Sequence, residues 1–246
     1  MMKKLLNPIS ITCGSAGLGL ACMLARFWLF HDGQDPKGLL IASHPGNILA
    51  WIFTGLMAAL LLLCLYYKPS KLQFRSNAIS GTGSAVCTAC MALLAWQFFS
   101  GEAATVLILI TGILSVIATI CCGILTALRF LHKRPLLVLQ LPMLLVLIFL
   151  FLNNFQLWGA EPEHQRYFFS LISHACLMLA CYYRIAAARK LRSPTAYLVC
   201  SCGGIFCGLA AVPDLHFGWL YALWAVGFLF ENLSALPQRR VHHDAA

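Results

Sequence analysis

Eight long apolar runs, separated by short polar segments, dominate the chain. A helix needs about 20 residues to cross the hydrocarbon core of a bilayer, so runs of this length predict membrane-spanning helices. The pattern therefore predicts an all-α polytopic integral membrane protein with about eight transmembrane helices. Seven is the alternative, because the seventh run is short and Glu231 interrupts the eighth. The runs cover residues 9–30, 47–67, 77–99, 103–128, 136–155, 167–187, 196–212 and 217–236.

The basic residues mark one side of these runs. Fourteen of the 17 Lys and Arg residues lie in clusters at alternate polar segments, and six of the eight acids lie in the segments between them. This asymmetry follows the positive-inside rule and predicts that both termini and the loops at 68–76, 129–135 and 184–195 are cytoplasmic. The Arg239/Arg240 pair favours eight helices, since seven would place that pair outside.

The composition agrees with a membrane protein. The chain is 61% hydrophobic and 10% charged, with a mean hydropathy of +0.81, whereas a soluble domain carries about a quarter charged residues. We expect one membrane domain, 1–246, with a short cytoplasmic tail at 237–246, in a cytoplasmic (plasma) membrane. The net charge of +9 is explained by topology and by anionic lipid headgroups at the cytoplasmic face, so we expect lipid and not nucleic acid as the partner.

A short internal similarity suggests two halves, 1–134 and 135–246. The second run ends Cys64-Leu-Tyr-Tyr-Lys68 and the sixth ends Cys181-Tyr-Tyr-Arg184. Four plus four helices would form a parallel repeat, because an even number of crossings restores the orientation. Aromatic-then-basic boundaries also recur at the inner face of unrelated membrane proteins, so chance is the alternative to a 4+4 repeat.

Small residues predict where helices pack closely in lipid. Gly14 and Gly17 lie in the first run, and Gly204 and Gly208 have small-x-x-x-small spacing in the seventh. We expect Gly204 and Gly208 to face the first or third run, whereas the bulky runs 103–128 and 136–155 are expected to face lipid. Pro142 is expected to kink the fifth run. A substrate path along the glycines is the alternative to tight packing.

Polar side chains inside a membrane are costly, so they are candidates for function. His174, seven residues into its run, is the deepest ionisable group, and Ser170 lies one turn earlier on the same face. The alternative is a buried histidine bonded to neighbouring backbone or to a serine. Arg26 is expected to reach the headgroups or to pair with Asp32, Asp35 or Glu102. The candidate polar intramembrane site consists of Ser170, His174, Gln140 and Arg26.

The Ser-x-x-x-His spacing of Ser170 and His174 resembles zinc-dependent intramembrane hydrolases related to alkaline ceramidases. Such a site needs about three protein ligands, and no His-x-x-x-His pair follows in a later run. The twelve cysteines all lie within the runs and are expected to be packing residues. We therefore assign no catalytic residue, cofactor or metal. Weaker metal candidates, for which solvated loop surface is the alternative, are Glu161, Glu163, His164, Asp214 and His216.

Three functions stay open. The first is a non-catalytic membrane component, such as a sensor, a partner of another membrane protein or an accessory subunit. The second is a permease for a small solute. The third is an intramembrane or outer-face metal-dependent hydrolase. The first is preferred, because the sequence contains neither a catalytic signature nor a chain of intramembrane carboxylates for proton coupling.

Overall fold

The computed structural model describes residues 7–36, 39–67, 72–73, 76–101, 105–134, 136–160, 166–188, 194–214, 218–234 and 236–237. Within these residues the chain forms eight α-helices, the 3₁₀ turn η1 (Leu137–Gln140), and two strands of two residues each. The helices are α2 (Pro8–Asp32), α3 (Pro45–Tyr67), α4 (Ala78–Ser100), α5 (Val106–Phe130), α6 (Leu141–Ala160), α7 (Phe168–Ala188), α8 (Pro194–Ala210) and α9 (Gly218–Ser234).

The predicted class, a helical membrane protein, is supported by helix length and composition. In the described part of the chain, six helices, α2 to α7, are long and apolar enough to cross a membrane. The α8 helix is apolar but has 17 residues, and α9 also has 17. Each predicted apolar run overlaps one of the observed helices.

Local sequence signals place several helix ends. Pro8, Pro45 and Pro194 are the first residues of α2, α3 and α8, where a proline loses no intrahelical hydrogen bond. The side chain of Asn77 accepts from Ser80 N at 2.8 Å and caps α4. Pro142 is the second residue of α6, so the break expected inside the fifth run falls at the junction of η1 and α6.

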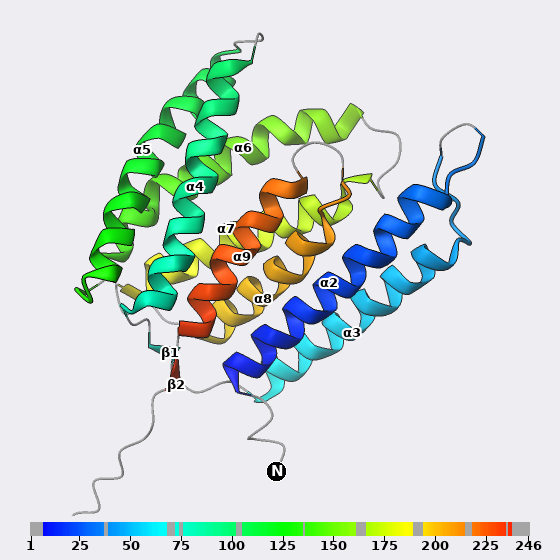
Figure 1. The fold of residues 1–246 in the computed structure, drawn as a ribbon, viewed down its shortest axis with the longest axis horizontal. Coiled ribbons are helices and arrows are strands. Elements are labelled where there is room, and N and C mark those ends of the chain that lie inside the picture. Colours follow the sequence, from blue (N-terminus) through cyan, green and yellow to red (C-terminus); the bar gives the residue numbers. More distant parts are fainter. Residues whose placement is uncertain are drawn as a thin grey trace, which may run out of the picture.

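Three central helices, α7, α8 and α9, are flanked by two helical hairpins (Figure 1). The α2–α3 hairpin packs on α8, and the α4–α5 hairpin packs on α9, while α6 lies against α5 and α7. Most of α8 is buried. Among the six long helices, α3 has the smallest share of buried residues. The helices α5 and α6, which correspond to runs 103–128 and 136–155 and were expected to face lipid, are both more buried than α3.

The closest helix contacts of α8 involve its glycines. A Cβ on Gly208 would lie 2.7 Å from Tyr221 O in α9, and a Cβ on Gly204 would lie 2.6 Å from Leu177 Cδ2 in α7. The expectation that these two glycines face the first or third run is therefore wrong. They face α7 and α9 because those helices form the central group with α8.

The α2 helix meets α8 through a different glycine from those expected. A Cβ on Gly19 would lie 3.0 Å from Phe206 O. At Gly14 a Cβ would be in ordinary contact with Leu60, 3.5 Å away, and at Gly17 it would meet nothing within 4 Å. Small residues thus mark α2 as a packing helix, but the tight approach falls at Gly19.

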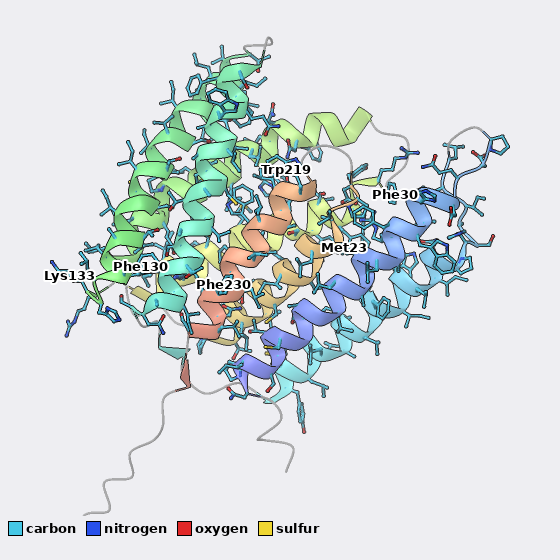
Figure 2. All side chains as sticks on the ribbon, viewed as in Figure 1. Met23, Phe30, Phe130, Lys133, Trp219 and Phe230 are labelled. Atoms are coloured by element: carbon cyan, nitrogen blue, oxygen red, sulfur yellow. The ribbon has the colours of Figure 1, made fainter. Side chains whose placement is uncertain are left out.

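The two short strands join distant segments at one end of the molecule. Strand β1 (Leu72–Gln73) follows α3, strand β2 (Leu236–Pro237) follows α9, and the two pair antiparallel. The first turns of α2 lie at this end too (Figure 1). Lys133 lies at this end, whereas Phe30 and Trp219 lie towards the opposite end (Figure 2).

Candidate functional site

Three clusters of buried polar side chains contain a charged group or a histidine, and they lie at different levels of the bundle. We name each after one residue: the Asp214 cluster (Asp214, Arg26, Ser170), the His174 cluster (His174, Tyr221, Asn154) and the Glu231 cluster (Glu231, Arg129, Arg184, Ser84). The α7 helix contributes one residue to every cluster, namely Ser170, His174 and Arg184.

The Asp214 cluster fastens the turn after α8 to α2 and α7. Asp214 forms a buried ion pair with Arg26 and accepts hydrogen bonds from Ser170 N at 2.8 Å and Ser170 Oγ at 2.7 Å. Arg26 also donates to Ala210 O at 2.7 Å and lies over the Phe169 ring, 4.5 Å from its centre. Burial raises the pKa of the Asp214 carboxyl, and Arg26 and Ser170 partly offset that rise.

Arg26 pairs with an acid that was not among its expected partners. It pairs with an acid 188 residues away, because α2 packs along α8 and Arg26 reaches the turn at the end of α8. Asp32 instead lies against His31 Nδ1, 2.5 Å away, and Asp35 accepts from Leu39 N at 2.7 Å. Glu102 lies outside the described residues.

The His174 cluster is sealed inside the bundle. His174 is fully buried; its Nε2 lies 2.7 Å from Leu147 O and its Nδ1 lies 3.0 Å from the Tyr221 hydroxyl. A carbonyl can only accept, so Nε2 carries the hydrogen and the Tyr221 hydroxyl donates to Nδ1. Asn154 Nδ2 donates to the same hydroxyl at 2.8 Å. Both ring nitrogens of His174 are therefore engaged in hydrogen bonds within the chain.

Gln140 does not join the other members of the expected polar site. Its backbone carbonyl, at the end of η1, accepts a hydrogen bond from Cys181 Sγ at 3.8 Å. Within the described residues no donor lies within hydrogen-bond distance of its buried Oε1. Of the four residues in the expected site, the structure brings Ser170 and Arg26 together around Asp214 and places His174 and Gln140 elsewhere.

The Glu231 cluster buries two guanidinium groups and one carboxylate. Glu231 Oε1 lies 2.5 Å from Arg129 Nη1, and its other oxygen pairs with Arg184. Arg129 also donates to Ser80 O at 3.0 Å and to Ser84 Oγ. Each of the three charged side chains is 1% exposed. The cluster joins α4, α5, α7 and α9.

Sequence reasoning missed this cluster. The positive-inside pattern treats Arg129 and Arg184 as boundary cations, and it allows Glu231 to face water. One signal was available, since Glu231 is the only acid within the eight predicted runs. An acid inside a membrane span predicts a basic partner. Only the packing of α4 against α5 and α9, and of α7 against α9, identifies which basic residues these are.

The described residues give no evidence that the five candidate metal ligands form one site. Glu161, Glu163, His164 and His216 lie outside the described residues, and Asp214 is paired with Arg26. The part of the chain that the structure describes contains no group of three or more His, Cys, Asp or Glu residues that could hold a metal ion. All twelve cysteines, each among the described residues, are free thiols.

No protein family, curated protein or solved structure matches this chain.

Proposed function

We propose that this chain is a non-catalytic component of a cytoplasmic membrane: a sensor, a partner of another membrane protein or an accessory subunit. The observation that carries the proposal is the state of His174. This side chain, the deepest ionisable group expected from the sequence, has no exposed surface and uses both ring nitrogens within the chain. A general base or a metal ligand needs a free nitrogen that a substrate or an ion can reach.

The three clusters support a bundle that holds one arrangement. Each cluster joins helices that are far apart in the sequence, and α7 takes part in all three. Buried ion pairs and hydrogen bonds between such helices hold the helices in one relative position. A rigid core suits a subunit that holds or senses a partner, and in this proposal α7 is the helix through which a partner's binding would reach the whole bundle.

Eight membrane crossings with both termini cytoplasmic complete the proposal. The pairing of β1 with β2 supports it, because the segments after α3 and after α9 then lie on one side, as even numbers of crossings require. At 1.5 Å per residue α8 and α9 are each about 25 Å long, slightly less than the bilayer core, so their flanking turns complete the crossing. Exposed Lys133 and Arg134 would then face anionic lipid headgroups.

The proposal is tested by asking whether water reaches the bundle interior. Four buried cysteines, Cys87, Cys90, Cys181 and Cys202, report on it, since each is at most 2% exposed. Membrane vesicles are treated on both sides with a small, water-soluble methanethiosulfonate, and the modified cysteines are identified by mass spectrometry. We expect these four to stay unmodified until the protein is denatured. Modification in intact vesicles would contradict a sealed bundle and favour a permease.

A permease for a small solute is the second candidate, and the two charged clusters favour it. Arg26–Asp214 and Arg129–Glu231 lie on opposite sides of the His174 cluster along the bundle. Ion pairs at both ends that open in turn would admit a solute from one side at a time. Under this alternative, Arg26→Gln exposes interior cysteines to a reagent added on one side, and Arg129→Gln exposes them from the other.

A further inference from the structure

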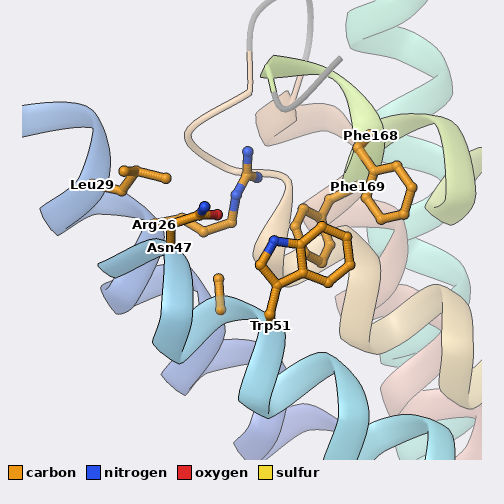
Figure 3. Close-up of a pocket in the computed structure, with 7 residues that line it drawn as sticks. Arg26, Leu29, Asn47, Trp51, Phe168 and Phe169 are labelled. Carbon is orange, nitrogen blue, oxygen red and sulfur yellow. The ribbon is translucent and has the colours of Figure 1, made fainter. Parts of the chain in front are cut away.

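A cavity of about 110 Å³ lies between α2, α3 and α7, beside the Asp214 cluster (Figure 3). The α2 helix contributes Arg26 to its wall, α3 contributes Asn47, Ala50 and Trp51, and α7 contributes Phe168 and Phe169. An engineered apolar cavity of about 150 Å³ binds benzene. The space here therefore suits a comparably small apolar group or a short length of hydrocarbon chain.

The residues that line the cavity favour an uncharged ligand. The guanidinium of Arg26 is paired with Asp214, donates to Ala210 O and lies over the Phe169 ring. Its charge is therefore neutralised inside the protein. Apart from Asn47, the remaining lining residues are apolar or aromatic, as in sites that take apolar groups: Leu29, Ala50, Trp51, Phe168 and Phe169.

The cavity is bordered by side chains that would face lipid. The rings of Trp51 and Phe168 lie 5.7 Å apart and bridge α3 and α7. Trp51 is 51% exposed, and Ile48 and Ile52 beside it on α3 are 52% and 50% exposed. In a membrane-embedded bundle such exposed apolar residues face lipid, so a hydrocarbon chain can reach the cavity from the bilayer.

The depth of the cavity corresponds to the region where a lipid's acyl chain begins. Asn47 and Trp51 lie within the first two turns of α3, which begins at Pro45, and Phe168 is the first residue of α7. Asn47 donates through Nδ2 to Ala42 O at 2.8 Å. That nitrogen carries two hydrogens, so a second donor remains for an ester carbonyl.

We propose that this cavity holds the ester end of one acyl chain of a membrane glycerolipid. The chain enters between α3 and α7, its first methylene groups lie against Trp51, Phe168 and Phe169, and Asn47 donates to the ester carbonyl. This inference is independent of the proposed function, because a lipid bound at this site is compatible with either a component or a permease.

The experiment uses two photoactivatable phospholipids in vesicles that contain the full chain. One carries a diazirine close to the ester group, and the other carries it at the end of the acyl chain. After irradiation, labelled residues are identified by mass spectrometry. We expect the near-ester probe to label 47–51 and 168–169 several-fold more than the terminal probe does. Equal labelling by the two probes there would overturn the proposal, as would labelling by a water-soluble diazirine in place of the lipid.

Two matched variants distinguish labelling inside the cavity from labelling of the general lipid-facing surface. Ala50→Leu fills the cavity and should remove most near-ester labelling of Phe168 and Phe169, while labelling of exposed Ile120 on α5 stays unchanged. Ala59→Leu, at an exposed position on α3, should leave both unchanged. If Ala50→Leu does not fold, Asn47→Leu replaces it and should shift the label away from the cavity. Undiminished cavity labelling in the filled variant would refute the site.

Discussion

A Cβ atom on Gly83 of α4 would lie 2.7 Å from the carbonyl oxygen of Gly227 in α9. From the other side, a Cβ on Gly227 would lie 3.2 Å from the carbonyl oxygen of Gly83. Glu231 is one turn beyond Gly227, and its Cγ would lie 2.8 Å from the same Gly83 Cβ. The close approach of the two backbones therefore brings the Glu231 carboxylate to Arg129.

Gly83→Ala should separate α4 from α9 and weaken the Glu231 cluster. The added methyl group meets backbone, which cannot move aside as a flexible side chain can, so we expect destabilisation of about 1–3 kcal/mol. The measurement is the midpoint of thermal unfolding in detergent. Gly55→Ala is the control, because a Cβ there meets nothing within 4 Å. An unchanged midpoint for Gly83→Ala would mean that the two helices are not in tight contact.

Glu231→Gln should be far more damaging than Arg184→Met. The first change leaves two buried guanidinium groups without a carboxylate, and breaking a buried ion pair in this way costs about 3–5 kcal/mol. The second change keeps the Arg129–Glu231 pair and removes the surplus buried charge, so we expect little loss of stability. Thermal unfolding of both variants in the same detergent checks the order, and the reverse order would contradict the paired arrangement.

Tyr221→Phe should destabilise the His174 cluster. The lost hydroxyl leaves His174 Nδ1 without its donor and Asn154 Nδ2 without its acceptor. A buried polar group that loses its hydrogen-bond partner lowers the free energy of unfolding by about 1–3 kcal/mol. Tyr182→Phe is the matched control, since Tyr182 is 52% exposed. Equal unfolding midpoints for the two variants would show that the hydroxyl of Tyr221 is not engaged.

The topology is tested with reporter fusions at Gly101 and Ala246. Positive-inside asymmetry predicts that Gly101, between the third and fourth runs, is outside and that Ala246 is cytoplasmic. An enzyme reporter active only in the cytoplasm should be active at Ala246 and inactive at Gly101. Reporter activity at both positions would contradict the arrangement with eight membrane crossings.

Much of the secondary structure could be predicted from local patterns. Each apolar run overlaps a helix, and Pro8, Pro45 and Pro194 stand at helix starts, where a proline loses no intrahelical hydrogen bond. These features depend on residues within a turn or two of one another and on the cost of exposing backbone polar groups to lipid. The amino-acid sequence alone therefore determined the class of fold and the approximate limits of its helices.

Only the tertiary structure decided which polar groups meet. Arg26 finds Asp214 188 residues away, and Arg129 finds Glu231 102 residues away. Apolar side chains are accommodated equally well by lipid and by protein, so the hydrophobic pattern of a membrane helix does not say which face meets which neighbour. That choice is made by close backbone approaches such as Gly83 against Gly227 and Gly208 against Tyr221, whose geometry exists only once the helices have packed.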